Sequence, residues 1–206
     1  MFITIEGPEG SGKSTAVNTA VAKLEQLGYK IVRTREPGGT PISEQIREVI
    51  LNKENTKMDP RTEALLYAAS RRQHLVEKVW PALERGEIVI CDRYLDSSLA
   101  YQGGARHLGI DEVLNVNLFA TEHTYPDLTL LFDIDPEVGL ARIAANSARE
   151  VNRLDLEKLE FHKNVRDSFL LLAKRYPERY VVIDASKSME EVAKDTIDAI
   201  LNKLCK

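Results

Sequence analysis

Short apolar runs alternate along the chain with longer stretches in which apolar residues recur at helical spacing. The runs at 88–91 and 128–132 are almost continuously apolar, which is typical of strands covered on both faces. Together with similar runs they predict strands at residues 2–6, 30–34, 88–91, 128–133 and 180–184. Strands separated by helices form βαβ units, so the pattern predicts an α/β protein with a parallel sheet.

Helical patterns fill the intervals between these strands. Gly28 suits the position after the first helix, and Asp59 followed by Pro60 suits the start of a long one. Pro81 is expected to end or kink that long helix. The predicted helices lie at about 13–27, 43–51, 60–83, 95–102, 111–121, 136–146, 156–176 and 188–204. The stretch 146–152 is polar and irregular.

Composition limits the class of protein. The 206 residues are 43% hydrophobic and include 28 basic and 32 acidic residues, which gives a net charge of −4. A general nucleic-acid-binding protein is usually basic, whereas a small anionic ligand needs only local positive charge. No stretch approaches 18 uninterrupted apolar residues, and the first ten residues lack the pattern of a secretory signal. We expect one domain over residues 1–206, with no nucleic-acid or membrane partner.

The cysteines and histidines predict no metal cluster. Cys91 and Cys205 are too few for a disulfide framework or a zinc site, and the four histidines share no metal-ligand spacing. So few cysteines are typical of a reducing compartment, and we expect a cytoplasmic protein.

The strongest motif is a phosphate-binding loop. Residues 7–14 match G-x-x-x-x-G-K-[ST], directly after a predicted strand and directly before a predicted helix. The matching residues are Gly7, Pro8, Glu9, Gly10, Ser11, Gly12, Lys13 and Ser14. Glycines let successive backbone N–H groups face an anion, Lys13 would bridge the β- and γ-phosphates of a nucleotide, and the Ser14 hydroxyl would bind Mg²⁺. The alternative is a glycine-rich turn that merely precedes a helix.

The loop alone does not distinguish an enzyme from a nucleotide switch. A GTPase switch would need N-K-x-D to read guanine, and residues 52–55 read Asn-Lys-Glu-Asn after a helix rather than a strand. No Asp in the chain has a Gly three residues later, so the second switch motif is also missing. The small size and the arginines near acceptor-like loops favour a small-molecule kinase.

A second group of candidate residues follows the third predicted strand. Asp92 and Arg93 come at its carboxyl end, where open parallel sheets bind their ligands. Asp92 is similar to the carboxylate that supports Mg²⁺ or its water shell, and the planar fork of Arg93 suits phosphate oxygens. The alternative is a salt bridge at the end of a strand.

The chain resembles the thymidylate kinases over essentially its whole length. The resemblance rests on FITIEGPEGSGKS, TREPGGT, TEALLYAASRRQH, DRYLDSSLAYQG and YPDLTLLFDIDPEVGLAR, in that order. It implies a three-layer P-loop fold with a five-stranded parallel sheet surrounded by helices. It also implies a homodimer that uses Mg²⁺ and transfers the γ-phosphoryl group of ATP to dTMP, which gives dTDP.

The resemblance also implies a binding site for dTMP. Tyr67, which is Phe in many relatives, would stack on thymine. Arg71 would reach a base carbonyl, and Ser98 and Gln102 would read other edge groups of the base. Tyr101 would lie against the deoxyribose and crowd a 2′-hydroxyl.

Further residues would hold the phosphates and the ATP. Arg47 and Arg93 match the family's clamp on the dTMP phosphate, and Glu9 takes a loop position where an acidic group meets the 3′-hydroxyl and nearby Mg²⁺. Glu36 lies in a loop that faces the same site. At the ATP end, Thr15 extends the phosphate loop, and Arg142 matches the arginine that packs on adenine.

Several of these residues have plainer interpretations. Tyr67 could be a core residue, since apolar residues surround it. Arg71 and Arg72 could be a solvated basic pair. Gln102 could cap a helix, and Arg47 could be an ordinary surface arginine.

The resemblance implies a lid near residues 144–155. Some family members carry an arginine inside the phosphate loop, but here the loop has Glu9, Gly10 and Ser11. We therefore predict that a lid arginine, Arg149 or Arg153, supplies the missing charge, since such an arginine can contribute a factor of about 10³–10⁵ in rate. Arg153 is favoured because it adjoins the following helix. The alternative is that both are solvated.

Three other functions are compatible with parts of the pattern. A deoxynucleoside kinase would phosphorylate a sugar hydroxyl and would need a general-base carboxylate, against which the basic phosphate clamp argues. A non-catalytic nucleotide switch would give no product, and a monophosphate kinase for another base would prefer a different acceptor.

Overall fold

The computed structural model describes residues 1–145 and 153–205. In this part of the chain, five parallel strands form one sheet in the order β2-β3-β1-β4-β5. The strands are β1 (Phe2–Glu6), β2 (Ile31–Arg35), β3 (Ile88–Asp92), β4 (Leu128–Asp133) and β5 (Tyr180–Asp184). The predicted parallel sheet is confirmed, with strand boundaries that differ by one residue at β2 and β3.

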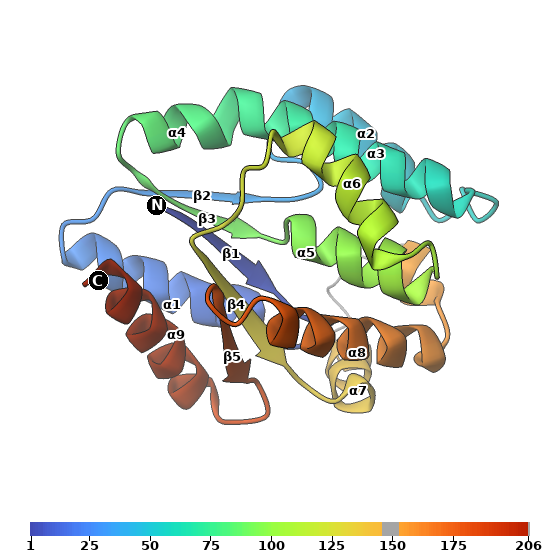
Figure 1. Cartoon of the computed structure of the whole chain (residues 1–206). Coiled ribbons are helices and arrows are strands. Elements are labelled where there is room, and N and C mark those ends of the chain that lie inside the picture. The colour runs from blue at the N-terminus through green and yellow to red at the C-terminus, as the bar shows by residue number, and fades with distance from the viewer. Residues whose placement is uncertain (146–152, 206) are drawn as a thin grey trace.

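Helices cover both faces of the sheet (Figure 1). The longer helices are α1 (Lys13–Gln26), α2 (Pro41–Leu51), α3 (Pro60–His74), α6 (Ile110–Thr121), α7 (Pro136–Ala144), α8 (Leu159–Arg175) and α9 (Met189–Leu204). Two short helices are α4 (Trp80–Glu84) and α5 (Leu95–Ser98). Alternate residues of β1 enter different cores. Phe2 packs with residues of α8, while Ile3 and Ile5 pack with residues of α1 and α9.

The structure differs from the helix predictions where wide π-helical turns intervene. The predicted helix 60–83 consists of α3, a π-helical segment at Leu75–Val79, and α4, in which Pro81 lies in the first turn. Proline lacks an N–H donor and crowds the preceding turn, so a wider turn before it avoids both problems. The predicted helix 95–102 is likewise α5 followed by a π-helical segment at Leu99–Ala105.

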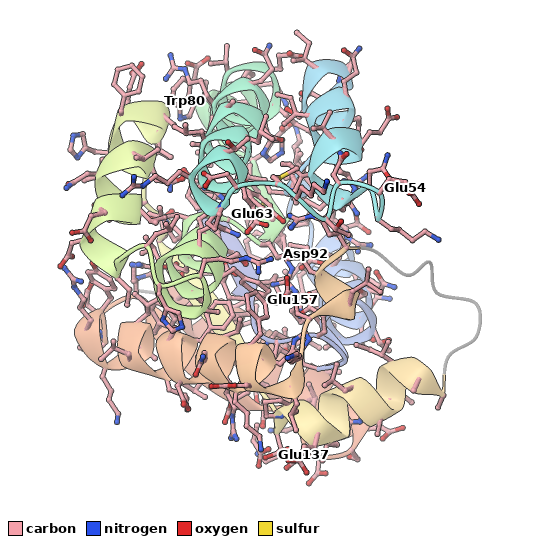
Figure 2. The ribbon with its side chains drawn as sticks, turned by 90° about the vertical axis from the view of Figure 1, so that its right-hand side faces the viewer. Glu54, Glu63, Trp80, Asp92, Glu137 and Glu157 are labelled. Carbon is pink, nitrogen blue, oxygen red and sulfur yellow. The ribbon has the colours of Figure 1, made fainter. Side chains whose placement is uncertain are left out.

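The sheet brings several connections to one edge. The phosphate loop leaves β1, the segment with Glu36 leaves β2, and Arg93 leaves β3, all at the carboxyl ends of parallel strands. Figure 2 looks onto this side of the molecule, with Asp92 near the centre of the view and Glu54, Trp80 and Glu137 nearer the rim. Within the described ranges, no helix is long and apolar enough to cross a membrane.

Candidate active site

A cavity of about 770 Å³ opens at the carboxyl edge of the sheet. All nine residues predicted to bind dTMP line it: Glu9, Glu36, Arg47, Tyr67, Arg71, Arg93, Ser98, Tyr101 and Gln102. The phosphate-loop residues Glu9, Gly10, Ser11, Gly12, Lys13, Ser14 and Thr15 also line it. Gly7 and Pro8 do not, but their carbonyl groups accept hydrogen bonds from Lys13. The two predicted nucleotide sites therefore share one continuous cavity.

Glycine is required at two positions of the phosphate loop. Gly7 and Gly10 have φ values of 135° and 73°, in the region that favours glycine. A Cβ atom on Gly7 would overlap the carbonyl oxygen of Phe132, and one on Gly10 would overlap that of Gly139. The loop thus lies against β4 and α7 with no room for side chains at these positions.

Lys13 is buried and folded onto its own loop. Its Nζ donates to the carbonyl oxygens of Gly7 at 2.9 Å and Pro8 at 2.8 Å, and to Ser11 Oγ at 3.1 Å. Burial and the charge of Arg93 lower the pKa of Lys13 to about 8, although the nearby carboxylates oppose this shift. The ammonium group is held by neutral acceptors, and a phosphate would offer it a charged one.

Glu9 and Arg93 form an ion pair inside the cavity. Arg93 Nη2 lies 2.8 Å from Glu9 Oε2, and Tyr101 donates its hydroxyl to the same oxygen at 2.6 Å. Burial opposes ionisation of Glu9, but the charges of Arg93 and Lys13 outweigh it and lower the pKa of Glu9 to about 2. Arg93 Nη1 also donates to Gly7 O and Ser97 Oγ, each at 3.2 Å. Arg93 is therefore held next to the phosphate loop.

Asp92 and Ser14 are the candidate ligands for a metal ion. Both line the cavity, and Asp92 Oδ1 is buried with no hydrogen-bond partner among the described residues. An unpaired buried carboxylate oxygen is costly unless something binds it, and a carboxylate with a hydroxyl is the kind of oxygen donor set that Mg²⁺ takes. These residues fit the expected ion.

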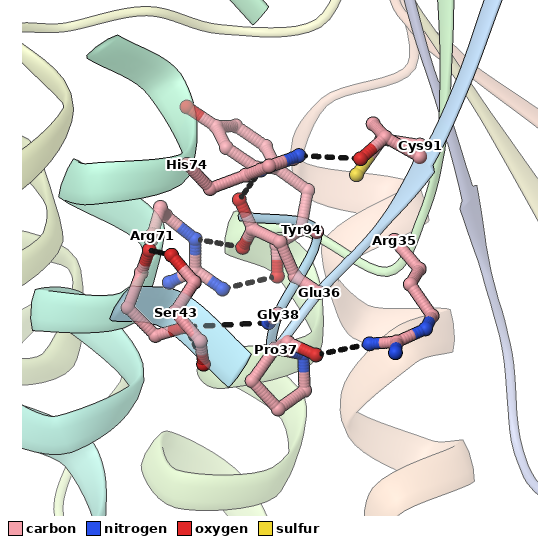
Figure 3. A network of polar contacts seen from close by, with 12 residues as sticks. Arg35, Glu36, Pro37, Gly38, Ser43, Arg71, His74, Cys91 and Tyr94 are labelled. Atoms are coloured by element: carbon pink, nitrogen blue, oxygen red, sulfur yellow. Dashed lines mark hydrogen bonds and ion pairs between the residues drawn. The ribbon is translucent and has the colours of Figure 1, made fainter. Parts of the chain in front are cut away.

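Arg71 is clamped at the other end of the cavity (Figure 3). It is 1% exposed, and its Nε donates to Glu36 Oε2 at 2.7 Å. Its Nη2 donates to Tyr94 O at 2.9 Å, while its Nη1 donates to Ser98 Oγ at 3.1 Å and to Asn117 Oδ1. Arginine has five N–H donors, so one remains for a ligand. Arg71 is not a solvated residue, whereas Arg72 is 40% exposed and pairs with Glu122.

The other predicted dTMP residues surround this clamp. Gln102 donates Nε2 to Glu63 Oε1 at 2.8 Å, and Arg47 donates Nη1 to Pro37 O at 2.9 Å. Tyr67 is partly exposed to the cavity rather than enclosed in the core, and burial together with the charge of Glu63 raises the pKa of its hydroxyl. Glu36 lines the cavity, but its carboxylate is engaged by Arg71 and by His74 Nδ1 at 2.9 Å.

The structure adds residues that the sequence did not single out. Asn117 comes from α6, and no local pattern connects it to Arg71. Arg35 lines the cavity as the last residue of β2, and the rule that located Asp92 at a strand end would have located it too. At the ATP end, Arg142 donates to Ala185 O at 3.1 Å. Residues after β5 line the cavity beside it, namely Ala185, Lys187, Met189 and Val192.

Of the two predicted lid arginines, the structure describes only Arg153. Arg149 lies outside the described residues. Arg153 is buried in a short 3-10 turn, Arg153–Leu156, where it binds Glu63 Oε2 and donates Nε to Ile50 O at 2.9 Å. It does not line the cavity, although its neighbour Leu154 does. In this structure Arg153 is therefore not brought to the phosphate loop, because a buried carboxylate and a helix-end carbonyl hold it.

Glu36, His74 and Cys91 lie together, with their potential ligand atoms within 4.8 Å of one another. Both ring nitrogens of His74 are hydrogen-bonded, to Glu36 and to Thr34 Oγ1. Arg71 occupies the remaining oxygen of Glu36. This cluster is a hydrogen-bond network that holds Arg71.

Comparison with known proteins gives consistent results. A sequence model of the family described as thymidylate kinase matches residues 5–196. The chain is 58% identical over 206 residues to the thymidylate kinase of Bacillus pumilus (strain SAFR-032), with 100% of this chain and 97% of that one covered. It is 56% identical over 203 residues to the enzyme of Halalkalibacterium halodurans, with coverage of 98% and 97%. The crystal structure of thymidylate kinase from Ehrlichia chaffeensis is similar at 32% identity, with a TM-score of 0.78 and 98% of both chains covered.

Proposed function

Because the chain belongs to the thymidylate kinase family and phosphorylates dTMP with ATP, we propose that the residues of its cavity divide this work between a donor end and an acceptor end. One observation carries the proposal. A phosphate loop and a clamped arginine lie in the same cavity, with the Glu9–Arg93 pair also in its wall.

At the donor end, the phosphate loop binds ATP. Backbone N–H groups of residues 7 and 9–15 face the phosphates, Lys13 exchanges its carbonyl contacts for phosphate oxygens, and Arg142 packs on adenine. Ser14 and Asp92 would hold Mg²⁺, partly through water. When bound, the ion supplies positive charge that offsets the charge of the ATP phosphates.

At the acceptor end, the cavity binds dTMP. Arg47 and Arg93 hold its phosphate, Glu9 orients Arg93 and the sugar, and Glu36 orients Arg71. Tyr67 stacks on thymine, and Tyr101 lies against the deoxyribose. Arg71, Ser98 and Gln102 contact the edge of the base.

The transfer step needs no covalent intermediate with the enzyme. A phosphate oxygen of dTMP attacks the γ-phosphorus of ATP in line, the bond from that phosphorus to the β-phosphate oxygen breaks, and ADP leaves. Lys13 and Arg93 stabilise the charge on the transferred group. A lid arginine, Arg149 or Arg153, adds to this, and Arg153 has to leave Glu63 and Ile50 to do so.

We also propose a cytoplasmic homodimer, with α2, α3 and α6 forming the contact between subunits. These helices pack side by side (Figure 1) and carry exposed apolar side chains. The side chains are Ile42, Val49, Leu65 and, at 91% exposure, Phe119. An apolar surface of this kind is typical of a protein–protein interface.

The division between donor and acceptor ends is tested by Lys13→Ala. We expect the variant to lose phosphoryl transfer while calorimetry shows dTMP binding within a few-fold of the original. Lys13 contacts only donor phosphates in this proposal. Loss of dTMP binding in a folded variant would contradict the assignment.

A further inference from the structure

A buried carboxylate lies behind the cavity wall and is not part of the proposed chemistry. Glu63 of α3 is 1% exposed. Its Oε1 accepts from Gln102 Nε2 at 2.8 Å and from Arg106 Nε at 3.3 Å, and its Oε2 accepts from Arg106 Nη2 at 3.4 Å and from Arg153. Figure 2 labels Glu63 at the start of its helix, facing the side on which Glu157 lies.

These contacts keep Glu63 ionised. Burial opposes ionisation, but the hydrogen bond from Gln102 and the charges of Arg106 and Arg153 outweigh it, so the pKa of Glu63 lies below its usual value. An ionised carboxylate only accepts hydrogen bonds. Any carboxamide that contacts it must therefore present its NH₂ group.

This requirement fixes the orientation of Gln102. With Nε2 bound to Glu63, the amide oxygen points away from the carboxylate, and no described residue donates a hydrogen bond to it. Gln102 lines the cavity, so its oxygen is available there as an acceptor. Thymine carries an N–H donor at ring position N3, whereas cytosine has an acceptor at that position.

We propose that Glu63 is a positioning residue that determines base specificity. Glu63 binds the NH₂ group of Gln102, so the amide oxygen of Gln102 meets the base as a hydrogen-bond acceptor. It thereby favours pyrimidines with an N3–H group over cytosine. The inference rests on the proposed function, in which Gln102 contacts the edge of the base.

Glu63→Gln tests this proposal, because the new amide can donate to Gln102 and allow it to turn over. Calorimetry would measure dissociation constants for dTMP, dUMP and dCMP. We expect the preference for dTMP over dCMP to fall about tenfold, the value of one buried hydrogen bond. The ratio of dTMP to dUMP should stay constant, since both bases carry N3–H. A general loosening of the site would weaken the binding of all three nucleotides alike, so it would not change the ratio of two dissociation constants measured in the same variant.

Two matched variants separate this role from simple loss of charge. Glu157→Gln removes the other carboxylate that binds Arg106, at 2.6 Å, without touching Gln102, and should leave both ratios unchanged. Glu63→Asp keeps an acceptor-only group and should retain the preference for dTMP. A fall in the dTMP preference of Glu157→Gln equal to that of Glu63→Gln would overturn the proposal.

A double-mutant cycle with Gln102→Ala locates the effect. Glu63→Gln should not change the dTMP to dCMP ratio further in the Gln102→Ala background. If Gln102→Ala alters the ratio and Glu63→Gln does not, this proposal fails and the role of Gln102 stands. If Gln102→Ala leaves the dTMP to dCMP ratio unaltered, both the proposal for Glu63 and the assignment of Gln102 to the base fail. Should Glu63→Gln not fold, a crystal structure of the original chain with dTMP decides, since Gln102 Nε2 turned to the base would contradict the proposal.

Discussion

Arg71 uses four of its five N–H donors on groups of the protein. Its orientation is therefore set before any nucleotide arrives, so a ligand need not restrict a flexible side chain in order to bind it. The remaining donor is on Nη2, which also binds Tyr94 O. The side chain is suited to one carbonyl acceptor in a fixed place.

Arg71→Ala is expected to weaken dTMP binding by about 1.5–3 kcal/mol, because the base loses a charged donor. The KM for dTMP should rise while that for ATP changes little, as measured by steady-state kinetics. Arg72→Ala is the matched control, since the adjacent Arg72 pairs with Glu122 and lies over the Trp80 ring, and it should change neither constant. Equal changes in both KM values for Arg71→Ala would contradict its assignment to the base.

Glu6 gives a prediction about pH. Burial and the charge of Asp96 raise its pKa to about 8 from an ordinary value of 4.5. The folded chain thus holds a proton that the unfolded chain releases, and this stabilisation, full below pH 4.5, is lost as the pH rises towards 8. Glu6→Gln lacks this titration. Its free energy of unfolding, compared with that of the original chain, should therefore rise by about 1.4 kcal/mol for each pH unit between pH 5 and 7. Urea unfolding at several pH values measures this, and a constant difference would contradict it.

The sequence predicted which residue types line the cavity but not how they are held. The spacing of Tyr67 and Arg71 locates them on one helical face. The partners of Arg71 come from other segments: Glu36 follows β2, Tyr94 follows β3, and Asn117 lies on α6. No local pattern encodes contacts between residues so far apart in the chain. The sequence favours Arg153 as the lid arginine because it adjoins the following helix, and no pattern in the sequence marks Glu63 as its buried partner.

At the scale of elements, the π-helical segment at Leu99–Ala105 supports Tyr101 and Gln102. It packs closely against α8, and a Cβ atom on Gly104 would overlap Ser168. The sequence predicted an α-helix here, since a π-helical turn has no distinctive residue pattern. The segment also packs against α6.

Gly104→Ala is expected to lower the free energy of unfolding by about 1–3 kcal/mol, because the added methyl group overpacks this contact. It should also raise the KM for dTMP, since Tyr101 and Gln102 lie on the displaced segment. Denaturant unfolding and steady-state kinetics measure these effects. Ser168→Gly should restore part of both losses in the double variant. If the double variant loses as much as the sum of the single ones, the contact is not the cause.

At the scale of the whole molecule, the apolar surface on α2, α3 and α6 predicts self-association. Phe119→Glu should shift the chain from dimer to monomer in sedimentation velocity, because a charge would be buried at the contact. Leu171→Glu is the control, since Leu171 is 54% exposed on α8. A monomeric original chain, or an equal shift in both variants, would contradict the proposed interface.

The parallel sheet could be predicted because apolar strands and helical stretches alternate regularly. The strand order β2-β3-β1-β4-β5 could not be read from the pattern itself, since pairing depends on which strands meet when the whole chain folds. The edge that carries the site could be predicted, because the phosphate loop and Asp92 both follow strands.

The most direct test is product analysis with ATP, Mg²⁺ and each common nucleoside monophosphate in turn. We expect conversion of dTMP to dTDP with formation of ADP, at a kcat/KM well above those for dCMP and UMP. Both should be poor, because the proposed acceptor site excludes the cytosine ring and the 2′-hydroxyl. Preferential phosphorylation of another monophosphate, or hydrolysis of ATP without transfer, would contradict the account.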